Sequence, residues 1–434
     1  MGKGLTRVAV IGAGYAGLAA AVELAERQVP VTVFEAGRTL GGRARRVERH
    51  GLSLDNGQHI LVGAYAEMLR LMRRVGVDPD QALRRTPLSL HYPGRLRLRA
   101  PRWPAPLHLA WALATAKGVA TADKLAAMQF MNCLRAAKFQ LGHDMSVADL
   151  LDDHGQSGEM RRLVWEPLCL ASLNTPPALA SARVFLNVLR DTLGARRAAS
   201  DLLLPRCDLS ALFPDAAAAF LGRNGADIRT GTAVRRVAVA DHGFQLNDAD
   251  DQRFSHAIIA AAPHQALPLF DNIPALDALR QTLMALTYEP IVTCYVACSA
   301  DVSLPEPMIG MAHGIVQWLF DRGQLDGPRG LLAAVISAGG RHQDLPHEAL
   351  AALVRDEVGS LLGRPLQPDW MQVIEEKRAT FACTPGVNRP QCATPLPNLF
   401  LAGDYVASDY PATIESAVRS GVRAAALVSA SLGA

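Results

Sequence analysis

A glycine-rich turn near the N-terminus restricts the fold of this chain more than any other feature. The motif GAGYAG at residues 12–17 follows the apolar run 8–11 and leads into a helical pattern over residues 16–27. A second apolar run, residues 31–35, ends on the acidic side chain Glu35. A strand, a glycine turn, a helix and a second strand in this order form the βαβ unit that binds dinucleotides. The sequence therefore predicts an α/β fold that starts with a parallel, Rossmann-like sheet.

Each position of this motif has a physical task. Gly12 permits the tight turn, Gly14 lets the backbone approach a pyrophosphate, and Gly17 allows the helix to pack closely on the strand. The N-terminus of the helix attracts the phosphate charge. Glu35 can accept hydrogen bonds from the hydroxyl groups of the adenosine ribose.

The residues just beyond Glu35 favour FAD over NAD as the dinucleotide. Gly41, Gly42 and Arg43 follow in one short loop. We expect Gly42 to keep this loop flat against the pyrophosphate and the guanidinium of Arg43 to reach it. A surface turn with a solvated arginine is the alternative interpretation of the same residues.

The pattern of the whole chain indicates two interleaved domains. A length of 434 residues exceeds what one hydrophobic core usually supports. Ala/Leu-rich helical patterns and a later group of strand patterns interrupt the dinucleotide-binding pattern. We predict an FAD-binding domain formed by residues 1–95, 205–285 and 379–434. Residues 96–204 and 286–378 would form an α+β substrate-binding domain with helices that could face a membrane.

Several individual elements can be placed from their periodicity. One helix is predicted over Leu209–Gly222 and another over His347–Leu362. A strand is predicted over Leu331–Ser337. The last segment, Asn398–Leu432, is predicted to form a strand, a turn and a long helix.

The two ends of the chain resemble one family. LFLAGD at residues 399–404 and YPATIESA at residues 410–417, together with the two glycine motifs, resemble the flavin amine oxidase superfamily. The resemblance implies that Asp404 binds the ribityl or pyrophosphate region of FAD and that a helix beginning near Thr413 points its amides at the flavin pyrimidine ring. A helix N-terminus there would stabilise the negative charge of reduced flavin near N1. By the same resemblance, the further cofactor-binding positions are Val234, whose backbone holds adenine, Gly403 and Ile414.

Internal segments narrow the resemblance to the carotene desaturase branch. They are DNGQH at 55–59, LVGAY at 61–65, WEPL at 165–168 and NTPP at 174–177. SDLLLP at residues 200–205 adds a likeness to the squalene-associated FAD-dependent desaturase group of bacterial hopanoid biosynthesis. This resemblance implies that reduced FAD removes an allylic hydroxyl from hydroxysqualene, giving squalene. It also places Gly57 and Gln58 beside the flavin.

Removal of an allylic hydroxyl requires a proton donor, and several residues are candidates. His59 lies in the segment that resembles flavin-facing backbone, and a histidine is suited to proton transfer near neutral pH. The carboxyl groups of Asp201, Asp208 and, ranked lower, Glu166 would need an apolar pocket to hold a proton. A hydrogen-bonded structural role is the alternative for His59, and helix capping is the alternative for Asp208.

Two tyrosines near the C-terminal motif are further candidates. Tyr405 and Tyr410 flank the expected flavin face, where their hydroxyls could bind water or their rings could stabilise a cation. Ordinary packing beneath the flavin is the alternative for both side chains.

The expected substrate is a C30 isoprenoid, which calls for a long apolar tunnel with few polar groups. The electron donor that reduces FAD is not identified by the sequence. A desaturase of phytoene-type carotenoid precursors would use the same flavin and tunnel, with the hydride moving in the opposite direction. An amine oxidase and a non-catalytic flavoprotein are the more distant alternatives.

Composition limits the partners and the compartment. The 44 basic residues nearly balance the 41 acidic ones, which argues against nucleic-acid binding. Seven cysteines without a CxxC pair argue against a metal site or a disulfide framework and favour a reducing cytoplasm. No cysteine or histidine lies in a motif that resembles the family's flavin-attachment sites, so we expect noncovalent FAD. Arginines at 95, 97, 99 and 102 beside Trp103 would suit the inner face of the cell membrane, and a charged hairpin is the alternative.

Overall fold

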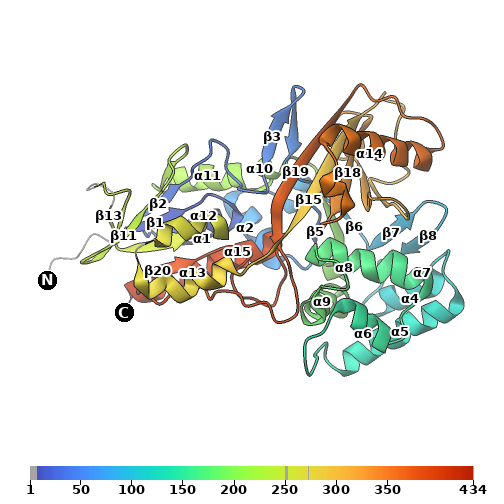
Figure 1. Ribbon diagram of the computed structural model, residues 1–434, viewed down its shortest axis with the longest axis horizontal. Helices are drawn as coiled ribbons and strands as arrows, with labels where there is room; N and C mark the ends of the chain where they lie inside the picture. Colours follow the sequence, from blue (N-terminus) through green and yellow to red (C-terminus); the bar gives the residue numbers. More distant parts are fainter. Residues whose placement is uncertain (1–6, 250–252, 272, 434) are drawn as a thin grey trace.

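The N-terminal glycine motif belongs to a five-stranded parallel sheet in the computed structural model, which describes residues 7–249, 253–271 and 273–433 (Figure 1). The strand order is β10 (Asp227–Arg229), β2 (Val31–Phe34), β1 (Val8–Ile11), β14 (His256–Ile259) and β20 (Leu399–Leu401). Val10 of β1 pairs with Val33 on one side and with Ile258 on the other. Every residue of β1, β2 and β14 is buried, as expected of a parallel sheet covered on both faces. The predicted α/β class is confirmed.

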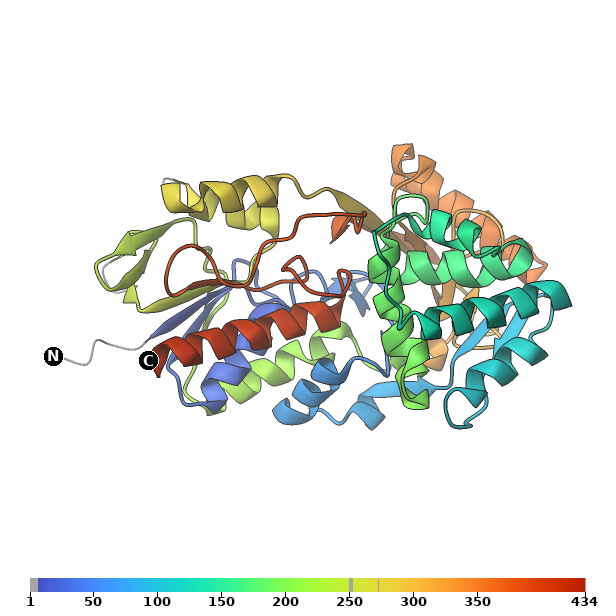
Figure 2. The same ribbon diagram turned by 90° about the horizontal axis from the view of Figure 1, so that it is seen from below.

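Three helices cover one face of this sheet. Figure 2 shows α1 (Tyr15–Glu26), α11 (Pro214–Arg223) and α15 (Ile414–Leu432) side by side below it. The axes of α1 and α15 approach closely because Gly421 has no side chain, and a Cβ there would overlap the carbonyl oxygen of Ala16. The prediction of a long C-terminal helix is thus confirmed.

The helix predicted over Leu209–Gly222 was wrong as a single element. The structure has two helices here, α10 (Leu209–Leu212) and α11, separated at Phe213. Phe213 leaves the helical region with a φ of −152°. Pro214 explains the break, because its ring disfavours helical backbone in the residue before it and starts a new helix readily.

A second sheet of five antiparallel strands stands at the other end of the molecule (Figure 1). Its order is β16 (Met308–Gly310), β17 (Trp318–Asp321), β18 (Leu331–Ser337), β15 (Tyr288–Ala297) and β19 (Trp370–Phe381). Alternate residues of β15 face opposite sides: Cys294 and Val296 pack with α14 (His347–Leu362), whereas Tyr295 belongs to the main core. The predicted bounds of β18 and α14 are confirmed.

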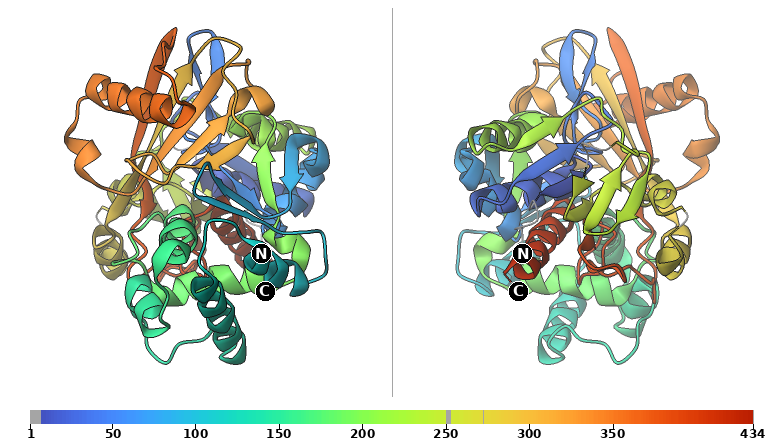
Figure 3. Two further views of the ribbon diagram at one scale, coloured as in Figure 1. Left: turned by 90° about the vertical axis from the view of Figure 1, so that its right-hand side faces the viewer. Right: turned by 90° about the vertical axis from the view of Figure 1, so that its left-hand side faces the viewer.

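A layer of short helices lies at the same end of the molecule as this sheet (Figure 3). It contains α4 (Leu107–Thr115), α5 (Thr121–Ala136), α6 (Val147–Asp153), α8 (Glu166–Leu173) and α9 (Ala182–Leu189). The rings of Phe130 and Trp165 meet edge to face at 5.3 Å, and the Trp165 indole N–H donates to Gln156 at 2.8 Å. Segments 96–204 and 286–378 thus share one end of the molecule, while the parallel sheet occupies the other.

Across residues 7–249, 253–271 and 273–433, none of the helices combines the length and apolar character needed to cross a membrane.

Candidate functional site

Two glycine loops meet at the carboxyl end of β1. Gly12 has a φ of 108°, and a Cβ there would stand 2.7 Å from the carbonyl oxygen of Ala260. Gly14 forms a parallel bridge with Gly41, and a Cβ on Gly42 would lie 3.2 Å from the Cα of Gly14. The two loops therefore form a backbone cradle that side chains would fill. Such a cradle, at the start of α1, suits a pyrophosphate.

The carboxylate of Glu35 is hydrogen-bonded to the backbone of this cradle. One carboxylate oxygen accepts a hydrogen bond from the backbone N–H of Ala13 at 2.8 Å, and the other accepts from Gly37 at 2.8 Å. Each oxygen keeps a further lone pair, which a ribose hydroxyl could use. The contact with ribose stays a prediction, and the bond to Ala13 is a role that the sequence did not indicate.

Arg43 and Asp404 come together although 361 positions separate them along the chain. Nη2 of Arg43 lies 2.7 Å from Oδ1 of Asp404, whose side chain is 9% exposed. Arg43 also donates to the carbonyl of Ala379 in β19. Burial acts to lower the pKa of Arg43, but the charge and hydrogen bond of Asp404, together with Glu376 and Tyr288, leave the pKa raised. The pair fixes the glycine loop to the C-terminal motif, and contact of either side chain with the cofactor stays a prediction.

Arg389 organises the loop that follows Asp404, and sequence reasoning missed it. Its guanidinium is buried, and burial lowers its pKa. It donates to five backbone carbonyls of the loop, those of Asp404, Tyr405, Val406, Ser408 and Tyr410. One side chain thus fixes the path of the whole segment between Gly403 and the start of α15.

The start of α15 is fixed by its own cap and by a neighbouring helix. The hydroxyl of Thr413 accepts a hydrogen bond from the Ser416 N–H at 3.1 Å. The buried carboxylate of Glu415 accepts from the N–H groups of Glu67 and Met68, at the start of α2 (Ala66–Val75). Hydrogen bonds thus fix the position of the Thr413–Ile414 end of the helix, whose free N–H groups and dipole suit an anionic ring edge.

The segment around Val234 is also held in place. Asn247 donates to the carbonyl of Ala233 at 3.0 Å and accepts from the N–H of Arg235 at 2.8 Å. Val234 lies between these two bonds. Its predicted contact with adenine remains untested by this geometry.

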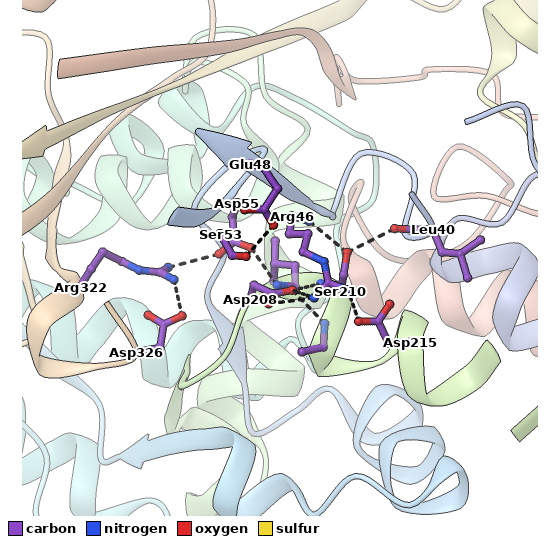
Figure 4. Close-up of polar contacts among 12 residues, drawn as sticks. Leu40, Arg46, Glu48, Ser53, Asp55, Asp208, Ser210, Asp215, Arg322 and Asp326 are labelled. Carbon is purple, nitrogen blue, oxygen red and sulfur yellow. Dashed lines mark hydrogen bonds and ion pairs between the residues drawn. The ribbon is translucent and has the colours of Figure 1, made fainter. Parts of the chain in front are cut away.

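A buried ion pair connects the segment 55–58 to the second sheet (Figure 4). Nη1 of Arg322 lies 3.3 Å from the carboxylate of Asp55 and donates to Oε1 of Gln58 at 2.6 Å. The backbone N–H of Gln58 donates to Thr293 of β15 at 3.2 Å. Burial raises the pKa of Asp55 to about 6, against the opposing effect of Arg322. Neither Asp55 nor Arg322 was a sequence candidate, because their pairing depends on residues 267 positions apart.

His59 lies beside this network. Its Nδ1 is 2.8 Å from the carbonyl oxygen of Gly57, so that nitrogen carries a proton and donates. Burial lowers the pKa of His59, and the charge of Arg43 acts in the same direction. Both effects favour a neutral imidazole at neutral pH, which is a poor proton donor.

The carboxyl candidates have structural partners. The side chain of Asp201 is 2% exposed and is paired with Arg85 at 3.1 Å and Arg197 at 2.8 Å. Asp208 caps α10 through the N–H groups of residues 210 and 211 and is paired with Arg46, as Figure 4 shows. Glu166 lies 2.8 Å from Arg161. The structure shows these three carboxyl groups in ion pairs or caps.

Tyr410 faces a cavity of about 200 Å³. Its hydroxyl donates to Asp191 at 2.6 Å, and the guanidinium of Arg419 lies 4.8 Å from its ring centre. Burial and the Asp191 contact raise the pKa of Tyr410 to about 12. The cavity is lined by Gly63, Ala64, Ala66, Asp191, Ala195, Arg196, Ala199, Tyr410 and Arg419. Asp191 is a functional candidate that the sequence did not single out.

Tyr405 differs from Tyr410 in its surroundings. Its side chain is buried, and its hydroxyl has no hydrogen-bond partner within residues 7–249, 253–271 and 273–433. Burial raises its pKa. A buried, unpartnered phenol next to Asp404 suits a group that supplies the missing partner.

Comparison with known proteins agrees with this geometry. Residues 15–429 match the family described as flavin containing amine oxidoreductase, and the chain belongs to this family. It is an FAD-dependent oxidoreductase. Among solved structures, a putrescine oxidase variant superimposes with a TM-score of 0.72 at 18% identity, covering 98% of this chain and 99% of that one.

Two curated relatives are more specific. A protein of Sinorhizobium fredii is 32% identical, covering 97% of both chains, and is named hydroxysqualene dehydroxylase. A protein of Rhodopseudomonas palustris with the same name is 33% identical, covering 97% of this chain and 98% of its own. The chain thus resembles these dehydroxylases along nearly its whole length.

Proposed function

We propose that this protein removes the allylic hydroxyl of hydroxysqualene with a hydride from reduced FAD, giving squalene and water. The observation that carries the proposal is the similarity, over 97% of this chain, to two relatives named hydroxysqualene dehydroxylase. Segments 96–204 and 286–378 would bind the C30 isoprenoid, and the remaining segments would bind FAD.

The residues described above fit noncovalent FAD. The glycine cradle of Gly12, Gly14 and Gly42 leaves room that a Cβ would fill, and Gly17 brings α1 close to it. Glu35 would bind the ribose hydroxyls, and the backbone of Val234 would bind the adenine.

Arg43, Gly403 and Asp404 would lie along the pyrophosphate and ribityl chain. Gly57, Gln58, Thr413 and Ile414 would border the flavin ring. When bound in reduced form, FAD supplies the hydride.

Tyr410 is the proton donor that we favour. A phenol with a pKa of about 12 keeps its proton at neutral pH, and Tyr410 is one of the residues that line the cavity. Transfer of this proton to the substrate hydroxyl would let it leave as water, while the hydride fills the vacated carbon. Solvent would then return a proton to the phenolate. Asp191 would position the phenol through their 2.6 Å hydrogen bond.

Anaerobic single turnover tests this function directly. The protein is reduced, mixed with hydroxysqualene, and followed by flavin absorbance while the extracted lipid is identified by gas chromatography. We expect one squalene for each flavin reoxidised. Failure of this reaction, with bleaching of the oxidised protein by a carotenoid precursor instead, would replace the proposal with a desaturase.

The role of Tyr410 can be tested in the same assay. Tyr410→Phe should slow flavin reoxidation by at least about 100-fold, the usual contribution of general acid catalysis, with little change in flavin content. Tyr92→Phe is a matched control, because its buried hydroxyl has no hydrogen-bond partner in the described ranges and lies on β7 (Ser89–Tyr92). A Tyr410→Phe rate equal to that of the control would exclude Tyr410 as the donor.

A further inference from the structure

Helix α4 presents a mostly apolar face to solvent in addition to its buried face. His108, Leu109, Ala112 and Leu113 are buried, and the opposite face presents Leu107, Ala110, Trp111 and Ala114 to solvent. Leu107 is 58% exposed and Trp111 is 47% exposed. Adjacent large apolar side chains exposed on one helix face are typical of an interaction surface. The exposed side of α4 therefore has the composition of a contact surface.

Neighbouring residues extend this surface. Trp103 is 46% exposed, and its ring centre lies 4.9 Å from that of Trp111. Leu125 of α5 is 55% exposed, and the adjacent Lys124 donates to the carbonyl of Ala114 at the end of α4. We define the α4 face as the four large exposed side chains Trp103, Leu107, Trp111 and Leu125. Figure 1 shows α4 and α5 at the end of the molecule away from the parallel sheet.

Three exposed cations flank α4 along the chain and form no ion pair within the described ranges, and one acidic residue, Asp123, lies in the first turn of α5. Arg99, Arg102 and Lys117 are exposed, and no acidic side chain within residues 7–249, 253–271 and 273–433 forms an ion pair with them. In contrast, Arg95 is paired with Glu159 and Arg97 with Glu306. Arg102, which precedes Trp103 in the sequence, is therefore among the cations free to meet an external anion.

We propose that the α4 face docks this protein on the surface of an anionic lipid bilayer. Tryptophan side chains prefer the interface between headgroups and acyl chains, and exposed arginines attract anionic headgroups. Helix α4 has nine residues and is about 14 Å long, so it would lie along the surface and not cross a hydrocarbon core of about 30 Å. The use of this contact to take a lipid substrate from the bilayer rests on the proposed function.

Sedimentation with vesicles tests the docking without turnover. The flavin-loaded protein should bind phosphatidylcholine vesicles that contain phosphatidylglycerol more tightly than vesicles of phosphatidylcholine alone, and added salt should weaken the difference. Trp103→Ser combined with Trp111→Ser should lower binding at least about tenfold. Arg99→Gln combined with Arg102→Gln should remove only the preference for the anionic lipid, about tenfold.

Met284→Ser combined with Val239→Ser is the matched control. These side chains are 67% and 57% exposed but lie on other elements, so binding should not change. Equal loss in this control, or no binding of the native protein to anionic vesicles, would overturn the proposal. Self-association of the native protein in ultracentrifugation that the tryptophan variant abolishes would also overturn it, since a second copy would then cover the face.

Turnover separates docking from catalysis. With hydroxysqualene in detergent, the tryptophan variant should react at the native rate, and with the substrate in vesicles it should react more slowly. If the native protein binds vesicles but forms no squalene in either medium, the proposed function fails and the docking proposal stands. Native turnover in both media by a variant that no longer binds vesicles would refute a role in substrate uptake.

Discussion

The cofactor-binding end and the helical layer are stabilised in different ways. At the first end, single polar side chains join distant segments, as in the pairing of Arg43 with Asp404 and the bonds from Arg389 to five carbonyls. The helical layer packs around buried apolar residues such as Phe130 and Phe185, with a smaller number of buried polar contacts such as those of Asn174. Position-specific contacts are needed where a ligand must fit the backbone, whereas a lipid site tolerates any well-packed apolar wall.

The largest effect on flavin binding should come from the backbone cradle. Gly12→Ala puts a Cβ 2.7 Å from the Ala260 carbonyl at a φ of 108°, which strains the turn by roughly 1–3 kcal/mol or more. We expect at least about a tenfold loss of FAD affinity. The flavin-to-protein absorbance ratio measures it. Gly222→Ala in α11 is the control, since nothing lies within 4 Å of its added Cβ. Full flavin content in Gly12→Ala would contradict the role of the cradle.

Loss of Arg389 should have the largest effect on stability, with a smaller effect on flavin binding than the cradle variant. Arg389→Ala removes the donor for five buried or half-buried carbonyls, and we expect roughly 3–5 kcal/mol lower stability together with flavin release. Denaturant unfolding and flavin fluorescence report the two effects. Arg355→Ala, at an exposed pair with Asp356, should change neither. A variant that is destabilised but keeps its flavin would show that the loop does not shape the cofactor site.

A core substitution in the helical layer should separate stability from flavin binding. Leu186 of α9 is fully buried, so Leu186→Ala should cost about 3 kcal/mol through the cavity it leaves. Flavin content should stay at the native level, because the residue lies in the layer and not at the cradle. Leu179→Ala, at a side chain that is 55% exposed, should be close to neutral. Flavin loss in Leu186→Ala would mean that the two regions are coupled more tightly than their contacts indicate.

The smallest effect is expected from the ion pair between the two regions. Burial raises the pKa of Asp55 to about 6 in the folded protein, above the usual value of about 4. The folded state then binds this proton more tightly than the unfolded state, so stability falls as the pH rises from about 4 to about 6. The free energy of unfolding of the native protein, minus that of the Asp55→Asn variant, should fall by roughly 1–3 kcal/mol between about pH 4 and about pH 6.

Urea unfolding of the flavin-loaded proteins at several pH values measures this difference. Asp356→Asn is the control, because this exposed carboxylate has no contact with the network of Asp55, Arg322 and Gln58. A difference between native protein and Asp55→Asn that does not vary with pH would show that Arg322 keeps Asp55 ionised throughout.

The sequence determined the elements whose signals are local. Gly12, Gly14 and Gly17 predict their own turn because each acts on the backbone next to it, and the periodicity of residues 347–362 predicted α14 with its bounds. The single helix predicted over Leu209–Gly222 was wrong because Pro214 divides it, and this effect of proline is also local in the sequence.

Only the tertiary structure decided which polar groups meet. Tyr410 was a candidate by motif, but its partner Asp191 lies 219 positions away, and Arg322 finds Asp55 across 267 positions. The position of a residue in the sequence does not predict such partners, because the fold and not the local backbone brings the two side chains within hydrogen-bond distance. For the same reason, the sequence alone did not distinguish Asp201 and Asp208 from Tyr410 as proton-donor candidates. The structure distinguishes them because it pairs both aspartates with arginines.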